Sequence, residues 1–146
     1  MSASKPGPLE SINRLIRENR VGDFASPNLA LGMRPVEFGP GTSKWSWESQ
    51  APASLNPFGT IGGGYLAVFI DEMLSTAIGS VLEAGEYAVT AEVKLSYLRA
   101  LRPAALTGEA RVIRRTRTLA FMEASIINER GELAVTATST WAIAKA

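Results

Sequence analysis

The longest apolar segment of the chain runs from Gly64 to about Leu82 and has the spacing of a helix. An amphipathic surface helix carries one apolar stripe, whereas the apolar positions here cover more than one. They are Leu66, Val68, Phe69, Ile70, Met73, Leu74, Ile78 and Val81. The pattern predicts a helix that protein covers on several sides, ending at Gly85.

The segment before this helix predicts a shorter helix and two strands. Pro8 suits a first helical position, and apolar residues recur at helical spacing after it, so a helix is expected over about residues 8 to 20. Strands are expected from Ala30 to Glu37 and from Ser43 to Ser49. Alternation puts Trp45 and Trp47 on one face of the second strand.

Four further strands are predicted after the long helix. In the first, apolar Val89, Ala91, Val93, Leu95 and Tyr97 alternate with polar Thr90, Glu92, Lys94 and Ser96. One face should therefore meet a core, and Thr90 should lie off that face. The stretches Leu106 to Arg114, Leu119 to Ile127 and Leu133 to Ile143 predict an antiparallel meander.

This order of elements predicts an α+β fold in which one long helix lies across an antiparallel sheet. One helix cannot cover such a sheet alone, so we expect a dimer that extends the sheet. The chain has 146 residues and 46% hydrophobic content, which suits one compact domain over 1–146, with its core at about 29–143.

Composition excludes several kinds of function. The net charge is +1, so no overall field should recruit nucleic acid or an anionic membrane. The chain has no cysteine and no histidine, which removes disulfides, thiolate metal sites and a histidine base. The first eight residues have no apolar core of a signal peptide, so a cytoplasmic protein without metal or cofactor is expected.

The chemistry concentrates in the block from Asn56 to Asp71, where Gly62, Gly63 and Gly64 open the long helix. Backbone N–H groups at a helix start, aided by the helix dipole, stabilise a developing oxyanion. Asp71 follows two turns later, and we expect it to act on the same bound group.

Structural interpretations of the same residues remain open. The glycines could form a tight turn, Asn56 could cap one, and Asp71 could be a solvated helix charge. Thr90 could be an ordinary strand residue. Glu72 should point about 100° away from Asp71, toward solvent or a basic partner.

The pattern Asn-x-x-Gly-Thr-x-x-Gly-Gly-x-x-x-x-x-x-Asp resembles the acyl-CoA thioesterases of the hot-dog fold. Val-Thr-x-Glu on the next strand and Gly-Glu after the proline belong to the same resemblance. It covers roughly Leu29 to Ile143 and is nearest to the phenylacetate-pathway branch. It implies a sheet wrapped around one central helix, with the N-terminal helix as an addition.

The resemblance also implies roles for individual residues. Gly63 matches the glycine whose N–H polarises the thioester carbonyl, and Asn56 matches a residue that positions substrate or water. Asp71 matches the nucleophile or general base, and Thr90 matches a hydroxyl residue that reaches the site from the partner subunit. Gly62 stands where the family commonly has histidine, and a glycine cannot supply that side chain's contact.

Arginines at the strand ends are candidates for binding the phosphates of coenzyme A. The alternative is that they are solvated side chains at the rim of the hairpins. They are Arg99, Arg102, Arg114, Arg115 and Arg117. Gly62 and Gly64 complete the expected substrate contacts.

We therefore expect an acyl-CoA thioesterase that assembles as a homodimer or a dimer of dimers. The alternative is a non-catalytic protein that binds acyl-CoA or another hydrophobic ligand. A hot-dog dehydratase or hydratase is disfavoured because those enzymes generally depend on a histidine, which the chain lacks.

Overall fold

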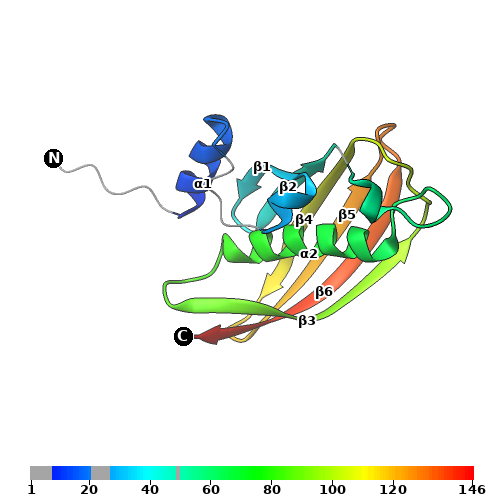
Figure 1. Ribbon diagram of the computed structural model, residues 1–146. Helices are drawn as coiled ribbons and strands as arrows, with labels where there is room; N and C mark the ends of the chain where they lie inside the picture. The colour runs from blue at the N-terminus through cyan, green and yellow to red at the C-terminus, as the bar shows by residue number, and fades with distance from the viewer. Residues whose placement is uncertain (1–7, 21–26, 49) are drawn as a thin grey trace.

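The computed structural model describes residues 8–20, 27–48 and 50–146. Two α-helices, two short 3-10 helices and six strands follow one another in these ranges (Figure 1). In chain order they are α1 (Pro8–Arg17), η2 (Pro27–Leu31), β1 (Met33–Gly39), β2 (Thr42–Trp47), η3 (Pro52–Ser54), α2 (Gly63–Gly79), β3 (Glu86–Tyr97), β4 (Leu106–Arg115), β5 (Leu119–Ile127) and β6 (Leu133–Lys145).

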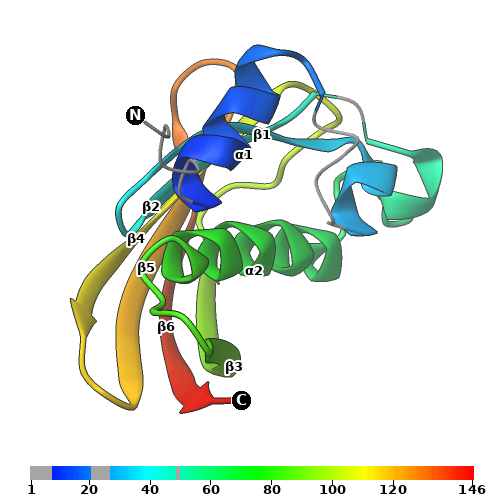
Figure 2. The same ribbon diagram turned by 90° about the vertical axis from the view of Figure 1, so that its left-hand side faces the viewer.

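The strands form one antiparallel sheet in the order β1-β2-β4-β5-β6-β3. Figure 2 shows this sheet curving around α2, with β1 above the helix and β3 below it. The right-handed twist of neighbouring strands produces such curvature. The predicted α+β hot-dog architecture is confirmed, and β3 is left as an edge strand.

Burial of α2 explains why its apolar positions exceed one stripe. Phe69, Ile70, Met73 and Leu74 are fully buried against the sheet. Gly108 on β4 makes the close approach possible, because a Cβ there would lie 2.1 Å from the sulfur of Met73. Any side chain at this position would force the side chains of Met73 and Phe69 to move.

The two tryptophans of β2 lie on the face toward α2, as their alternation predicts. Trp45 and Trp47 are buried, and each indole N–H finds an acceptor. Trp45 Nε1 donates to Thr76 Oγ1 at 3.0 Å, and Trp47 Nε1 donates to the Leu31 carbonyl at 2.8 Å. A buried indole keeps both its apolar contacts and its hydrogen bond in this way.

Some element boundaries differ from the expectation. The strand expected from Ala30 begins only at Met33, because η2 occupies the residues up to Leu31 and Gly32 turns the chain at φ 89°. The left-handed backbone of Gly32 cannot continue a strand. The N-terminal helix ends at Arg17 instead of about residue 20. The second strand, β2, ends at Trp47, and residue 49, where its end was expected, lies outside the described residues.

Glu72 corrects a second expectation. It does not face solvent: its side chain is buried, and Asn28 Nδ2 of η2 donates a hydrogen bond to its carboxylate. The turn that η2 forms packs against α2 and covers this side of the helix. A buried carboxylate needs such a donor, since burial without one is costly.

Candidate active site

The first turn of α2 presents two free backbone donors. Gly62 is the N-cap, and its own N–H donates to the Ser54 carbonyl at 2.8 Å. The N–H groups of Tyr65 and Leu66 donate back to the Gly62 carbonyl at 3.0 and 3.2 Å. Among the residues that the structure describes, the N–H groups of Gly63 and Gly64 have no backbone acceptor. Helix starts with such groups bind oxyanions.

Tyr97, the last residue of β3, lies directly over this helix start. Its hydroxyl donates to the Gly63 carbonyl at 2.8 Å. A Cβ on Gly63 would lie only 3.2 Å from Cζ and Oη of the tyrosine, closer than ordinary contact. Glycine at position 63 therefore leaves room for the tyrosine ring beside the helix start.

Asp71 lies on the exposed side of α2 and is paired with a hydroxyl. The side chain of Asp71 is half-buried, and Thr90 Oγ1 donates to its Oδ1 at 2.8 Å. This hydrogen bond fixes the direction of the carboxylate, and within the described ranges its second oxygen has no hydrogen-bond donor. Charge-assisted bonds of this kind are about twice as strong as neutral ones.

A β-bulge in β3 places Thr90 there, against the expected alternation. The register with β6 shifts between Thr90 and Glu92, so Ala91 is an extra residue. Thr90 pairs with buried Trp141 and points toward α2, whereas Val89 pairs with Ala142 on the opposite face. The expectation that Thr90 lies off the core face is therefore wrong. Bulges re-aim side chains in this way and are frequent beside active sites.

The contact between Thr90 and Asp71 is made within one chain. The resemblance implied a hydroxyl that reaches the site from the partner subunit, but this hydrogen bond needs no second copy.

Gly63 and Asp71 are too far apart to serve one bound group within one chain. Both belong to the uninterrupted helix α2, eight residues apart. At a rise of 1.5 Å per residue, their backbones lie about 12 Å apart along the axis. The expectation that they act on the same group is wrong for a single chain.

Asn56 is engaged in its own turn. Its Oδ1 accepts from the N–H groups of Phe58 and Thr60 at 3.0 and 3.2 Å, and its Nδ2 donates to Thr60 Oγ1 at 2.7 Å. The turn closes at Gly59, which has φ 74°. These bonds match the structural interpretation of Asn56, because an Asx turn leads the chain into α2.

The structure separates the candidate arginines into two groups. Arg99 follows the end of β3 and forms an ion pair with Glu132 at 3.9 Å. At the other end of β3, the guanidinium of Arg115 is paired with Glu86, whose side chain is 5% exposed. Arg115 and Arg117 line a hollow of about 660 Å³, together with Lys145. Arg114 precedes Arg115 in β4 and does not line this hollow.

Two of the acidic side chains that pair with these arginines have lowered pKa values. A backbone hydrogen bond from the N–H of Glu83, with a further contribution from Arg115, lowers the pKa of Glu86. A hydrogen bond from Asn128 and the charge of Arg99 lower the pKa of Glu132. In the described ranges, acidic side chains do not gather in threes as metal ligands would.

Sequence reasoning missed the contact of Tyr97 with Gly63. The alternation assigned Tyr97 to the core face of its strand, which is correct, but gave no partner to its hydroxyl. A buried tyrosine hydroxyl usually finds a hydrogen-bond partner, but Tyr97 is 51% exposed, and the sequence carries no signal that names the Gly63 carbonyl as its acceptor.

Comparison with known proteins gives a family and a fold. Residues 58–135 match the Thioesterase superfamily. A phenylacetic acid degradation-related protein from Ralstonia eutropha is similar in structure, with TM-score 0.77 and 27% identity over 90% of this chain and 98% of that one. No curated protein matches the sequence.

Two further solved structures share the fold at lower identity. Thioesterase HI1161 from Haemophilus influenzae has TM-score 0.78 and 23% identity, over 99% of this chain and 96% of that one. The PaaI protein of E. coli, from the phenylacetic acid degradation operon, has TM-score 0.76 and 18% identity, over 92% and 94% of the two chains. Across the described residues, the helices are too short or too polar to cross a membrane.

Proposed function

This chain belongs to the thioesterase superfamily, with the hot-dog fold of the PaaI-like thioesterases, and on that premise we propose that it hydrolyses acyl-CoA. The products are a free carboxylic acid and coenzyme A. No cofactor takes part. The family shows thioester hydrolysis in general, and the assignment of acyl-CoA and of the residues below is our proposal.

The observation that carries the proposal is the carboxylate of Asp71, held by Thr90 on the exposed side of α2. Gly64, Ala67, Val68 and Ser75 are also at least partly exposed on α2. Small residues near a positioned carboxylate leave space for a ligand, and Gly63 and Gly64 supply oxyanion donors at the start of the same helix.

A homodimer completes the site. β3 is a twelve-residue edge strand, and long unpaired edges invite another strand. Antiparallel pairing of two β3 strands about a two-fold axis also makes the two α2 helices antiparallel. An offset that sets Asp71 of one chain against the helix start of the other then removes the separation of about 12 Å within one helix.

The chemistry follows from these groups. The thioester carbonyl oxygen accepts hydrogen bonds from Gly63 N–H and Gly64 N–H, which stabilise the negative charge of the tetrahedral intermediate. Asp71 takes a proton from water as the water attacks the carbonyl carbon, or attacks that carbon itself and forms an anhydride that water cleaves. In either case the C–S bond breaks, and the thiolate leaves and is protonated.

Tyr97 supports the oxyanion donors. Its hydrogen bond to the Gly63 carbonyl holds the peptide that carries the Gly64 N–H, and it increases the polarity of that peptide. It is a positioning residue in this proposal.

We assign the phosphates of coenzyme A to arginines at the two ends of the sheet. Arg114 and Arg117 are the proposed phosphate contacts at one end of the sheet, and Arg99 is the contact at the other. Arg115 contributes charge, but its guanidinium is committed to Glu86. Antiparallel pairing of β3 brings the two ends together, because the first residues of one strand then lie beside the last residues of its mate.

A second candidate function is a binder of acyl-CoA or of another hydrophobic ligand. The observation that favours it is Gly62, which stands where the family commonly has a histidine side chain. A pocket that keeps its shape but lacks one catalytic contact would bind without efficient turnover.

One experiment separates the two functions. The wild-type protein is incubated with short-chain, long-chain and aryl acyl-CoAs, and release of free thiol is followed alongside calorimetric binding. Hydrolysis of at least one class at enzymatic rates supports the thioesterase. Tight binding with no release above the buffer rate would establish the binder instead.

A further inference from the structure

Two buried N–H groups of the sheet have no hydrogen-bond acceptor among the residues that the structure describes. They are Nε1 of Trp141 on β6 and Nε of Arg115 on β4. The other two tryptophans follow the general rule, since Trp45 and Trp47 both donate to an acceptor. A buried donor without an acceptor has lost the hydrogen bonds that water gave it, so each of these two donors needs an explanation.

The strand register places both donors in one row across the sheet. Trp141 pairs with Ala120 of β5, and Ala120 pairs with Arg115. Ala120 and Trp141 are 0% and 4% exposed, so this row lies on the inner face, toward α2. Neighbouring strands lie about 4.8 Å apart, which separates the backbones of Trp141 and Arg115 by about 10 Å. Between them the row contributes only the methyl group of Ala120.

The ion pair of Arg115 directs its guanidinium across this gap. Arg115 Nη2 donates to the carboxylate of Glu86 on β3, and β5 and β6 lie between β4 and β3 in the sheet. The side chain therefore reaches over the inner face toward β6. Because Nε precedes Nη2 along the side chain, Nε lies nearer to β5, where Ala120 stands.

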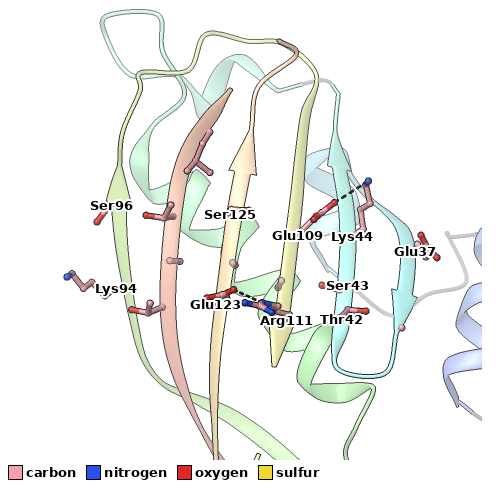
Figure 3. A pocket seen from close by; sticks show the side chains of 17 residues that line it. Glu37, Thr42, Ser43, Lys44, Lys94, Ser96, Glu109, Arg111, Glu123 and Ser125 are labelled. Carbon is pink, nitrogen blue, oxygen red and sulfur yellow. Dashed lines mark hydrogen bonds and ion pairs between the residues drawn. The ribbon is translucent and has the colours of Figure 1, made fainter. Parts of the chain in front are cut away.

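The outer face of the sheet shows how another arginine of β4 is satisfied. Arg111 points away from α2, and its Nε donates to Glu123, its pairing partner on β5 (Figure 3). On the inner face, the β5 partner of Arg115 is Ala120, which has no side-chain acceptor. Arg115 Nε therefore needs an acceptor that its neighbour on β5 does not supply.

We propose that one buried water molecule lies over Ala120 and accepts hydrogen bonds from Trp141 Nε1 and Arg115 Nε. Water can accept two hydrogen bonds, and buried waters typically bridge polar groups that lack a partner in the protein. The small side chain of Ala120 leaves the space, and the two long side chains beside it supply the donors.

Charge favours water over an anion at this site. The carboxylate of Glu86 already neutralises the guanidinium of Arg115. The backbone N–H of Glu83 also donates to that carboxylate, which strengthens its negative form. A bound anion would leave the group with a net negative charge in the interior, and such a charge is costly. A neutral acceptor has no such cost.

The water site is next to the proposed active site but does not depend on it. On its other side Trp141 pairs with Thr90, whose hydroxyl donates to Asp71. The water links β4 to β6 through side chains and so supports the row in which Thr90 stands. The site belongs to the folded chain alone, so its test needs no acyl-CoA.

The test is whether water contacts the indole N–H of Trp141 in NMR spectra of the folded protein. The indole signal that Trp141→Phe removes belongs to this residue; if that variant does not fold, Trp45→Phe and Trp47→Phe identify the signal by elimination. A rotating-frame experiment that excites water should give a cross-peak at this N–H with the sign of a dipolar contact, opposite to that of hydrogen exchange. Trp47 is the matched control, because its N–H donates to the Leu31 carbonyl and should give no such peak.

A larger side chain at position 120 should expel the water. Ala120→Val fills the space between the two donors, and the cross-peak should disappear. Ala142→Val is the matched control, because Ala142 follows Trp141 on β6 and lies on the opposite face, so the peak should remain. If Ala120→Val does not fold, Arg115→Lys replaces it. This variant keeps a positive charge for Glu86 but lacks the Nε donor, and it should weaken the peak.

Three outcomes would overturn the proposal. One is a Trp141 indole signal that shows no dipolar cross-peak to water in the wild type. Another is a folded Ala120→Val protein that keeps the peak. The third is a Trp141 resonance that moves when chloride replaces a large organic anion at constant ionic strength, which assigns the site to an anion.

Discussion

Mixing two inactive variants should restore activity, if Gly63 and Asp71 of different chains form one site. The first variant, Asp71→Asn, removes the carboxylate. The second, Gly63→Val, forces a side chain to within about 3 Å of the Tyr97 ring, since even a Cβ would lie 3.2 Å from Cζ and Oη. Each alone should lose roughly two to three powers of ten in rate, as for loss of an oxyanion donor.

The magnitude of the recovery follows from symmetry. In a mixed dimer, one site receives both altered residues and the other receives neither. Random pairing of equal amounts makes half of the dimers mixed, so about a quarter of all sites are intact. The mixture should therefore reach roughly a quarter of wild-type activity, far above either parent.

The assay is release of free thiol from acyl-CoA after the two variants are unfolded together in urea and refolded. Each variant refolded alone is the control, and light scattering checks that every sample assembles. A mixture no more active than its parents would refute the shared site. It would also mean that the separation of about 12 Å along α2 does not lead to a site shared between two chains.

Three further predictions concern single side chains. Thr90→Val removes the hydrogen bond to Asp71, and because a bond to a charged group contributes about 1.5–3 kcal/mol, kcat should fall roughly 10- to 100-fold. An unchanged kcat in steady-state kinetics would contradict this role. Gly79→Ala places a Cβ where no atom lies within 4 Å, so urea unfolding should show a gain of up to about 1 kcal/mol; a loss would mean that the glycine conformation is needed. Glu86 has a pKa lowered below 4.5, so its contribution to stability is present above that pH and is lost as the pH falls through the lowered pKa. Glu86→Gln, which also weakens the pairing with Arg115, should flatten the dependence of the urea midpoint on pH below about 4.5; a profile parallel to the wild type would contradict the shift.

The central parts of the fold could be predicted from the sequence. Apolar residues on several sides predicted the long helix. Alternation of apolar and polar residues between turn signals predicted the three strands of the meander. The start of α2 at Gly63 and both bounds of β4, Leu106–Arg115, lie within one residue of those expected, whereas α2 ends at Gly79, before the glycine at position 85 that was expected to end it. These elements can be predicted because the spacing of buried residues along a helix or strand is visible in a short stretch of sequence.

The details of the site could not be predicted in this way. The bulge at Ala91 leaves the local alternation intact and changes only which face each half of β3 presents. Its position depends on the partner strand, so one strand's pattern does not contain it. The burial of Glu72 has the same origin, because η2 and Asn28 reach it from a distant part of the chain.

The most direct test of the proposed thioesterase compares wild type with Asp71→Asn in single-turnover release of thiol from a hydrolysable acyl-CoA. The substitution keeps the size of the side chain and the bond to Thr90 can persist, so folding and binding should survive. We predict that the chemical step falls by roughly 10²- to 10⁴-fold, the usual contribution of a positioned base. A variant that hydrolyses the substrate at the wild-type rate would contradict the account.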